Sequence, residues 1–496
     1  MGIFVGIDLG TTNSLCCSLI DGDFKFLTFR GGSHLLPSSL LYRDGKMIVG
    51  DMARKKSVLY AENYISSSKT FMGDSTKKWK LEGREFSATD VATEILSYIK
   101  QEIEKQFNLK SEPDSEFEHN KTISAVVTVP AYFTANQIDE TKKAAEKSGF
   151  YVKQIIPEPI AAGVAYGFED KINEKIAVID IGGGTFDTSI LEALGNSYRT
   201  LAIEGDNKLG GNEFDEIIMD IFFRHIRKTA GIDLTSLESS KLSKENYLQA
   251  KQRLMAEAEN KKIQLSSAEK ISIDIPNLFE HNNYVFHTEI SRDKFEKDIS
   301  SLIKKIERKI ETSLREAFGN NNDDIDKVIL VGGTSYIPRI QKCIHEYFNQ
   351  APYSDKDLSK LVAMGAAIIA DDASTIEIRD KISHSLGIRL LGDKFYPLLN
   401  KNDVYPISVS KKFPYNGKNS NNFYLTIYEG EDDFVGNNHY YGRLNLQGIA
   451  DLKFGKALIQ VTFSFNKNRI LEVKAKNVAS GDEKTQNIKI DKTTTI

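Results

Sequence analysis

Cysteine, which disulfides and most structural zinc sites need, is rare in this chain. Its 496 residues include three cysteines, Cys16, Cys17 and Cys343, and no CxxC spacing. An odd, low number of cysteines without metal-ligand spacing excludes a disulfide framework and argues against a structural zinc site. The chain therefore fits a reducing compartment.

Long apolar runs and strong charge are missing as well. The most apolar run, residues 361–370, is too short to span a bilayer, and no basic residue precedes the first expected strand, as a signal peptide would require. The net charge of −4 is too small to suggest bulk nucleic-acid binding, and 34 glycines with 11 prolines exclude a collagen-like chain. We therefore expect a cytoplasmic protein that binds neither membrane nor nucleic acid.

The length and the charge distribution fit more than one domain. A chain of this size implies about two to four folding units. Residues 383–496 carry a charge balance of +5, and residues 1–382 one of −9. Two domains with different roles would explain this difference, and undirected drift of surface charge explains it equally well.

An internal repeat is the clearest feature of the first part. Residues 3–14 have the sequence IFVGIDLGTTNS, and residues 176–187 have IAVIDIGGGTFD. Each predicts an apolar strand ending in an aspartate, then a turn of glycine and threonine, then a second strand. Asp8 and Asp180 correspond at an offset of 172 residues. Such a repeat indicates the duplication of a half-domain.

The hydrophobic periodicity changes near residue 372. Before it, helical spacing predicts helices at residues 90–107, 137–148, 214–229, 244–265 and 292–318. After it, alternation predicts strands at residues 386–391, 395–399, 404–413, 422–429, 441–446, 458–465, 470–476 and 486–490. About eight short strands within about 110 residues indicate a β-sandwich. We expect an α/β domain over residues 1–372, a linker at 373–382, a β-sandwich at 383–491 and a tail at 492–496.

The two glycine and threonine turns suggest phosphate binding. Their backbone N–H groups can cradle phosphate oxygens, and the hydroxyls of Thr11, Thr12 and Thr185 add donors. Asp8 and Asp180, at strand ends, can hold Mg²⁺ through its waters. A plain turn is the alternative, but matched aspartates in two copies argue against it. No GxxxxGK[ST] sequence is present, which excludes a Walker-type loop.

Six motifs in a fixed order connect the chain to a known family. They are DLGTTNS, VPAYF, IIPEPIAAGVAYG, DIGGGTFD, KLGGNEFD and ILVGGTSYIPRIQ. With them, about residues 2–490 resemble the seventy-kilodalton heat-shock chaperone family (DnaK type). The short segment between Lys69 and Asp90 resembles the smaller, specialised bacterial branch (HscC type). The resemblance implies an actin-like ATPase domain with duplicated ribonuclease-H-like halves, followed by an all-β sandwich that binds extended apolar peptides.

The resemblance also implies roles for single residues in slow ATP hydrolysis. Lys69 would stabilise charge on the γ-phosphate, while Glu158 and Asp187 would orient or activate the attacking water. Thr185, in the second phosphate loop, is the fourth residue expected to take part in catalysis. Asp8 and Asp180 would hold Mg²⁺ through water, and the resemblance leaves K⁺ open as a further ion. The residues expected to bind ATP or ADP are Asp8, Gly10, Thr11, Thr12, Asn13, Asp180, Gly182, Gly183, Gly184, Gly210, Gly211, Glu259, Lys262, Ser266, Gly332, Gly333 and Tyr336.

In the β-sandwich, the resemblance implies a peptide-binding cleft. Main-chain hydrogen bonds would supply affinity there, and an apolar pocket would select side chains. By alternation most of the expected residues share one face of a sheet, and ordinary sandwich core is the competing interpretation for several of them. The expected residues are Ile388, Leu390, Leu391, Phe413, Asn416, Phe423, Leu425 and Ile459.

The chain also departs from the family pattern. Tyr336 stands where the family has an arginine that stacks on adenine. Ile138 and Gln154 replace arginines used in signalling between domains and in docking J-domain partners. Glu377 and Arg379 interrupt a linker that is usually apolar, and the family's helical lid is not expected after the last strand. Pairing with a J-domain co-chaperone or a nucleotide-exchange factor therefore stays open.

Several functions are compatible with these observations. The leading one is an ATP-dependent chaperone for unfolded or extended polypeptide segments. The second is a slow nucleotide-dependent switch that docks one dedicated partner. A sugar or acid kinase on the same fold is a third, and the C-terminal sandwich argues against it. The presence of Asp8, Lys69, Glu158, Asp180 and Thr185 argues against an inactive scaffold.

Overall fold

The chain forms two compact units. The computed structural model describes residues 3–108, 123–168, 170–279, 284–319, 325–353, 357–371, 373–414, 422–447, 458–478 and 483–486. The first unit comprises Met1–Ala131 and Thr141–Ile376, and the second comprises Tyr132–Glu140 and Glu377–Ile496. No sequence pattern predicted that Tyr132–Glu140 would group with the C-terminal part. Among the described residues, every helix is too short or too polar to cross a membrane.

One sheet of the first unit carries the first copy of the repeat. Its order is β11-β10-β1-β2-β3, and β4 pairs with the start of β2. The pairs β1–β10 and β10–β11 are parallel, whereas β1, β2 and β3 follow one another as antiparallel hairpins. The strands are β1 (Ile3–Asp8), β2 (Asn13–Ile20), β3 (Asp23–Phe26), β4 (Leu36–Pro37), β10 (Ile123–Val129) and β11 (Tyr151–Pro157).

A second sheet repeats this arrangement. β17 (Lys327–Val331) runs parallel to β12 (Asn173–Ile181), and β13 (Phe186–Leu194) and β14 (Ser197–Asp206) follow as antiparallel hairpins. In both sheets a strand with the repeated aspartate near its end leads into the hairpin turn. The predicted α/β fold with duplicated halves is therefore confirmed.

Two apolar helices of the first unit pack against each other. They are α4 (Glu158–Gly167) and α11 (Leu361–Ala370), and α11 also contacts β1, β2 and β10. A Cβ atom on Gly365 would lie 1.8 Å from the carbonyl oxygen of Ala161. Only glycine permits so close an approach of two helix backbones. The most apolar run of the sequence is thus a helix of the core.

Predicted helix boundaries differ from the observed ones by up to three residues, and one predicted helix is divided. α2 (Ala88–Gln106) begins before residue 90, because Ser87 caps it: Ser87 Oγ accepts from the Asp90 N–H at 3.2 Å, and Asp90 accepts from the Ser87 N–H at 2.9 Å. The single helix expected at 292–318 is α8 (Arg292–Asp298) followed by α9 (Ser300–Phe318). The apolar periodicity continues through the break and so conceals it.

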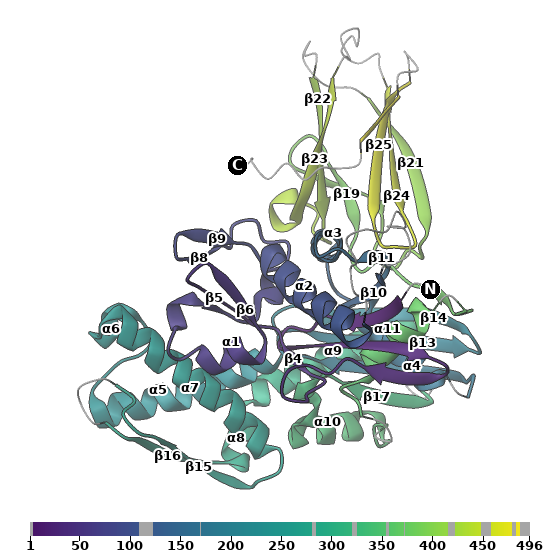
Figure 1. Ribbon diagram of the computed structural model, residues 1–496. Coiled ribbons are helices and arrows are strands. Elements are labelled where there is room, and N and C mark those ends of the chain that lie inside the picture. The colour runs from purple at the N-terminus through teal and green to yellow at the C-terminus, as the bar shows by residue number, and fades with distance from the viewer. Residues whose placement is uncertain are drawn as a thin grey trace. The chain divides into compact units, whose positions relative to one another are not determined.

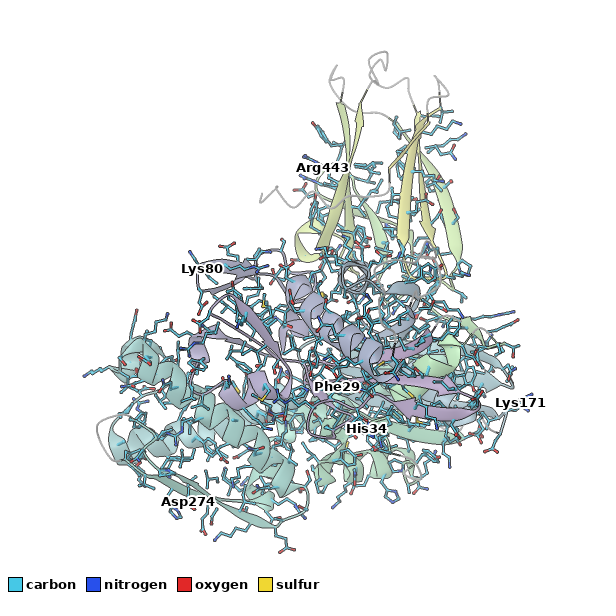
Figure 2. All side chains as sticks on the ribbon, viewed as in Figure 1. Phe29, His34, Lys80, Lys171, Asp274 and Arg443 are labelled. Carbon is cyan, nitrogen blue, oxygen red and sulfur yellow. The ribbon has the colours of Figure 1, made fainter. Side chains whose placement is uncertain are left out.

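Shorter elements complete the first unit, and helix α7 packs against α5 and β15 (Figure 1). Asp274 marks the hairpin of β15 and β16, and Lys80 marks the hairpin of β8 and β9 (Figure 2). The elements are β5 (Leu40–Arg43), β6 (Lys46–Val49), α1 (Asp51–Lys56), η1 (Ala61–Asn63), β7 (Tyr64–Ile65), η2 (Ser68–Phe71), β8 (Trp79–Leu81), β9 (Arg84–Phe86), α5 (Gly211–Ala230), α6 (Leu237–Ser240), α7 (Lys244–Leu265), β15 (Lys270–Ile275), β16 (Phe286–Ser291), η5 (Gly333–Tyr336) and α10 (Pro338–Phe348).

The second unit is the predicted β-sandwich. Its two sheets have the orders β20-β19-β22-β23 and β21-β24-β25-β26 (Figure 1). Side chains such as Leu444 and Phe463, one from each sheet, fill the core between them. The strands of these sheets are β19 (Leu386–Arg389), β20 (Phe395–Leu399), β21 (Ile407–Pro414), β22 (Asn422–Glu429), β23 (His439–Gln447), β24 (Leu458–Phe465), β25 (Leu471–Asn477) and β26 (Glu483–Gln486). The short strand β18 (Glu377–Arg379) precedes them in the chain and belongs to neither sheet, and η6 (Val435–Asn437) is a short helical turn between β22 and β23.

Several strands of the sandwich differ from the predicted ones, and two of them, β21 and β26, differ by three residues or more. β21 begins after Pro406 rather than at residue 404, because proline has no N–H to donate to a ladder. The last strand is Glu483–Gln486 rather than 486–490, and residues 487–490 and the tail at 492–496 lie outside the described residues. On β23, the Arg443 guanidinium lies 4.5 Å from the ring centroid of Tyr424 (Figure 2), a cation–π contact.

A buried carboxyl group joins Tyr132–Glu140 to the sandwich strands within the second unit. Glu429, at the end of β22, accepts the N–H of Ala135, the first residue of α3 (Ala135–Lys147), with both carboxyl oxygens at 3.0 Å. His384 Nδ1 lies 3.8 Å from Glu429 Oε1. Burial raises the pKa of Glu429 to about 8, although the Ala135 N–H and the charge of Arg469 oppose the rise.

Candidate active site

The two hairpin turns of the repeat touch each other. The first joins β1 to β2, and the second joins β12 to β13. The Gly182 N–H donates to the Thr185 carbonyl at 3.0 Å and closes the second turn. A Cβ atom on Gly183 would lie 1.9 Å from Thr12 Oγ1, so only glycine fits between the turns. The structure thus brings the two predicted phosphate loops together.

The start of helix α5 supports the second turn from one side. The Gly211 N–H donates to the Gly182 carbonyl at 2.9 Å, and the Asn212 N–H donates to the Gly183 carbonyl at 2.7 Å. From η5, Thr334 Oγ1 donates to the Gly182 carbonyl at 2.8 Å. Asn212 and Thr334 were not predicted as site residues, although both lie inside motifs that were recognised.

Lys69 and Glu158 form a buried ion pair beside the turns. Lys69 lies on η2 and Glu158 is the first residue of α4, and Lys69 Nζ is 2.7 Å from Glu158 Oε1. The lysine is 5% exposed and the glutamate 7% exposed. A buried ammonium group is tolerated only with a partner of opposite charge. Two residues that are 89 positions apart in sequence, and that were both predicted to be catalytic, are therefore in direct contact.

The neighbouring aspartates perturb one another. Burial raises the pKa of Asp8 to about 7; the charge of Glu158 adds to the rise, and Lys69 and the Thr128 hydroxyl oppose it. Burial raises the pKa of Asp180 well above its usual range, with further contributions from Glu158, Asp187 and Asp8. Closely spaced carboxyl groups in a desolvated site ionise only when positive charge lies nearby to stabilise them.

The carboxyl groups fit a hydrated Mg²⁺ ion. Mg²⁺ prefers oxygen ligands and usually keeps several of its waters. Within the part of the chain that the structure describes, no three His, Cys, Asp or Glu side chains are arranged to ligate a metal ion directly. Asp8 and Asp180 are the carboxyl groups that would hold such an ion through its waters.

Helix α7 contributes Glu259 and Lys262, two of the residues predicted to bind ATP or ADP. Lys262 is buried, and its Nζ donates to the Gly211 carbonyl at 3.0 Å and to Asp215 Oδ2 at 2.9 Å. Burial raises the pKa of Asp215 to about 6, and Lys262 opposes this rise. Glu259 pairs with Arg54 of α1 at 2.5 Å. Asp215 and Arg54 were missed, although Asp215 ends the KLGGNEFD motif.

The other predicted adenosine residues lie at the ends of short elements. Ser266 directly follows α7, and its N–H donates to the Ile263 carbonyl at 3.1 Å. Gly332 precedes η5 with φ of 82°, and Gly333 begins η5. Tyr336 ends it with 45% of its surface exposed, which leaves an aromatic face available for stacking.

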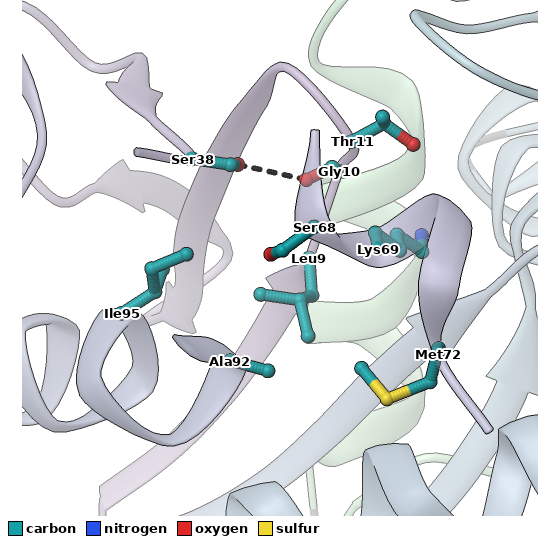
Figure 3. Close-up of a pocket in the computed structure, with 9 residues that line it drawn as sticks. All are labelled: Leu9, Gly10, Thr11, Ser38, Ser68, Lys69, Met72, Ala92 and Ile95. Atoms are coloured by element: carbon teal, nitrogen blue, oxygen red, sulfur yellow. Dashed lines mark hydrogen bonds between the residues drawn. The ribbon is translucent and has the colours of Figure 1, made fainter. Parts of the chain in front are cut away.

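A small cavity lies beside Lys69 (Figure 3). Its volume of about 10 Å³ is enough for about one water molecule, far less than a nucleotide needs. It therefore adjoins the first phosphate loop without being the nucleotide site. Its lining residues are Leu9, Gly10, Thr11, Ser38, Ser68, Lys69, Met72, Ala92 and Ile95.

Aromatic rings pack next to the turn that carries Lys69. Phe71, which ends η2, lies edge-on to Trp79 with 5.6 Å between ring centroids. Lys77 Nζ is 5.2 Å from the Trp79 ring centroid. Trp79 is the single tryptophan of the chain. The β8–β9 hairpin is thus tied to η2.

A family model described as Hsp70 protein matches residues 4–496. The chain belongs to the Hsp70 family. Members of this family are nucleotide-dependent chaperones that bind ATP or ADP with Mg²⁺, hydrolyse ATP and bind extended polypeptides. The resemblance inferred from six motifs is confirmed, and with it the actin-like ATPase fold followed by a β-sandwich.

Three residues predicted to bind peptide lie inside the Hsp70 sandwich core. Ile388, Leu425 and Ile459 are 2%, 4% and 1% exposed and belong to one hydrophobic cluster. Phe413 packs against that cluster, with its ring centroid 5.4 Å from that of Tyr396. The packing of these four residues matches the competing interpretation, in which they belong to the ordinary core of the sandwich.

The remaining peptide-binding candidates are exposed or lie outside the described residues. Leu390 and Leu391 follow β19 and are 36% and 76% exposed. Asn416 falls outside the described residues, and of Phe423 only the backbone, in β22, is described. Among the side chains of this predicted set that the structure describes, the two leucines are the most exposed apolar ones.

Proposed function

We propose that this Hsp70 protein hydrolyses ATP at the Lys69–Glu158 pair and uses the nucleotide state to control peptide binding by its β-sandwich. The supporting observation is the position of this buried pair, 2.7 Å from nitrogen to oxygen, beside two glycine and threonine turns that touch. Phosphoryl transfer needs a cation at the phosphates and a group that positions the attacking water. The pair supplies one of each.

The reaction assigns a separate task to each group. A water oxygen bonds to the γ-phosphorus while the bond from that phosphorus to the β–γ bridging oxygen breaks, and a carboxylate takes the water proton. Lys69 stabilises the negative charge on the γ-phosphoryl group. Glu158 and Asp187 orient the water and accept its proton, and the Thr185 hydroxyl contacts phosphate from the second turn.

The aspartates hold the metal ion. Asp8 and Asp180, whose carboxyl groups carry raised pKa values, would hold Mg²⁺ through its waters. The bound ion supplies positive charge against the phosphate oxygens. K⁺ is a further ion that we propose for the same region, and we propose that turnover is slow, as in a switch whose nucleotide state must persist.

The test is ATP turnover by the purified chain with and without short apolar peptides. Acceleration by peptides supports a chaperone of extended segments. Hydrolysis without any effect of peptides supports the alternative, a slow switch that docks one dedicated partner. Absence of hydrolysis in wild-type protein overturns both.

The linker is the observation that favours the alternative. In β18, Glu377 and Arg379 are exposed, and Ile378 between them is half-buried. Because one face of this strand is charged, only a narrow apolar stripe is left to dock and to transmit the nucleotide state. The transmission would run from an ATPase domain at residues 1–372 to a sandwich at 383–491. The linker at 373–382 would then transmit the nucleotide state weakly.

Single residues also bear on the partners and the location of the protein. Members of the family generally act with J-domain co-chaperones and nucleotide-exchange factors. Gln154, at the position where the family has the arginine that docks J-domain partners, carries no positive charge for such a partner. We propose that co-chaperone pairing differs from the family pattern, and that the three buried cysteines reflect a cytoplasmic location.

A further inference from the structure

Ser38 contacts the first phosphate loop at three points. It directly follows β4 and is 4% exposed. Its N–H donates to the Thr12 carbonyl at 2.8 Å, and its hydroxyl donates to the Gly10 carbonyl at 2.7 Å (Figure 3). Its Oγ also lies 2.9 Å from Ser14 Oγ. Because the one hydroxyl proton of Ser38 goes to Gly10, Ser14 is the donor in this last bond.

These bonds form a chain across the loop. It runs from the Ser14 hydroxyl through the Ser38 hydroxyl to the Gly10 carbonyl, and so joins the end of the loop to its beginning. Hydrogen bonds in a buried chain polarise and strengthen one another. The loop is already tight, since a Cβ atom on Gly10 would lie 2.1 Å from the Asn13 carbonyl oxygen. Ser38 therefore holds the start, the middle and the end of residues 10–14.

We propose that Ser38 is a positioning residue for the nucleotide phosphates. It fixes residues 10–13, so that their N–H groups and the hydroxyls of Thr11 and Thr12 face the phosphates, and it does so without touching the nucleotide. The inference rests on the proposed function, because it takes this loop as the phosphate-binding one. Ser38 lies outside all six recognised motifs.

Ser39 provides a matched control. It is 2% exposed, and its hydroxyl donates to the Gly50 carbonyl at 3.3 Å, away from the loop. Its N–H donates to the Pro37 carbonyl at 2.8 Å. The two serines thus share residue type, neighbourhood and burial, and differ in whether their side chains reach the phosphate loop.

The experiment compares ADP with adenosine. Dissociation constants for both, in the presence of Mg²⁺, are measured by calorimetry for the full chain and for Ser38→Ala and Ser39→Ala. Loss of a buried hydrogen bond should weaken ADP binding by Ser38→Ala about tenfold, which corresponds to about 1.4 kcal/mol. Adenosine binding should stay unchanged, because adenosine lacks the phosphates that the loop contacts. Ser39→Ala should bind both ligands like wild type.

Each other outcome has a definite meaning. Unchanged ADP binding by Ser38→Ala, an equal loss for ADP and adenosine, or the same selective loss in Ser39→Ala would overturn the inference. If Ser38→Ala does not fold, Ser38→Cys keeps the side-chain volume with a weak donor and should show the same selective loss. If wild-type protein binds no ADP, the proposed function fails first, and the inference falls with it.

Discussion

Replacing Glu429 by glutamine should stabilise the second unit at high pH and leave its stability unchanged at low pH. The glutamine amide oxygen can still accept the Ala135 N–H that Glu429 accepts at 3.0 Å. The substitution removes the negative charge and little else. Its effect therefore isolates the cost of ionising a buried carboxyl group.

The magnitude follows from the pKa of Glu429. Its ordinary value is 4.5, and burial raises it to about 8 in the folded protein. Between these two pH values the folded state keeps a proton that the unfolded chain has released, so stability falls as the pH rises through this window and then levels off. The full difference corresponds to about 5 kcal/mol. His384, at 3.8 Å, and Arg469 and Glu431 are the charged or titratable neighbours that set how much of it is realised.

The assay is calorimetric unfolding of wild type and Glu429→Gln at pH 5 and pH 9. Because the chain has two units, the transition of the second unit is compared by itself instead of assuming a single two-state transition. Glu472→Gln is the control, since Glu472 lies on β25 beside Lys474 at 3.5 Å with 38% of its side chain exposed. A melting temperature for Glu429→Gln that exceeds wild type equally at both pH values, or at neither, would refute the reasoning and show Glu429 ionised throughout.

Three further predictions concern catalysis, specificity and coupling. Lys69→Ala should lower ATP turnover by about 100-fold or more while Mg-ADP binding persists, because its charge acts mainly in the transition state; unchanged turnover in a single-turnover assay would remove Lys69 from the mechanism. Phe423→Val should admit bulkier side chains on a peptide array, with discrimination changing by roughly 1–3 kcal/mol, whereas an unchanged profile with lower stability would assign Phe423 to the core. ATP should change peptide affinity by less than the roughly 5–150-fold typical of allosteric coupling, and Leu at positions Glu377 and Arg379 should increase that factor; no change with both leucines would show that these charges do not limit communication.

The hairpin turns were open to prediction because their signals are local. A strand that ends in Asp8 or Asp180, followed by glycine and threonine, identifies a phosphate loop from a dozen neighbouring residues. The choice of Lys69 and Glu158 required the family resemblance, since composition alone does not separate them from other charged residues. Their 2.7 Å contact then came from the fold.

The long-range polar contacts were not open to prediction. Glu429 and Ala135 are 294 positions apart, and Ser38 reaches back 28 positions to Gly10. Periodicity shows which face of an element is apolar, but it does not show which distant polar groups meet. The same limit applies to the sandwich, where alternation placed Ile388 on an apolar face without showing whether that face lines a core or a cleft.

The packing of Phe71 against Trp79 has a spectroscopic consequence. Indole emission is sensitive to neighbouring rings and charges, and this chain has one indole, with a ring centroid 5.6 Å from that of Phe71. Phe71 and Lys69 share the turn η2, so a rearrangement of that turn when a nucleotide arrives would change the surroundings of the fluorophore. Unlabelled protein in a stopped-flow fluorimeter would thus report on the turn that carries Lys69, with no competing tryptophan signal from the β-sandwich.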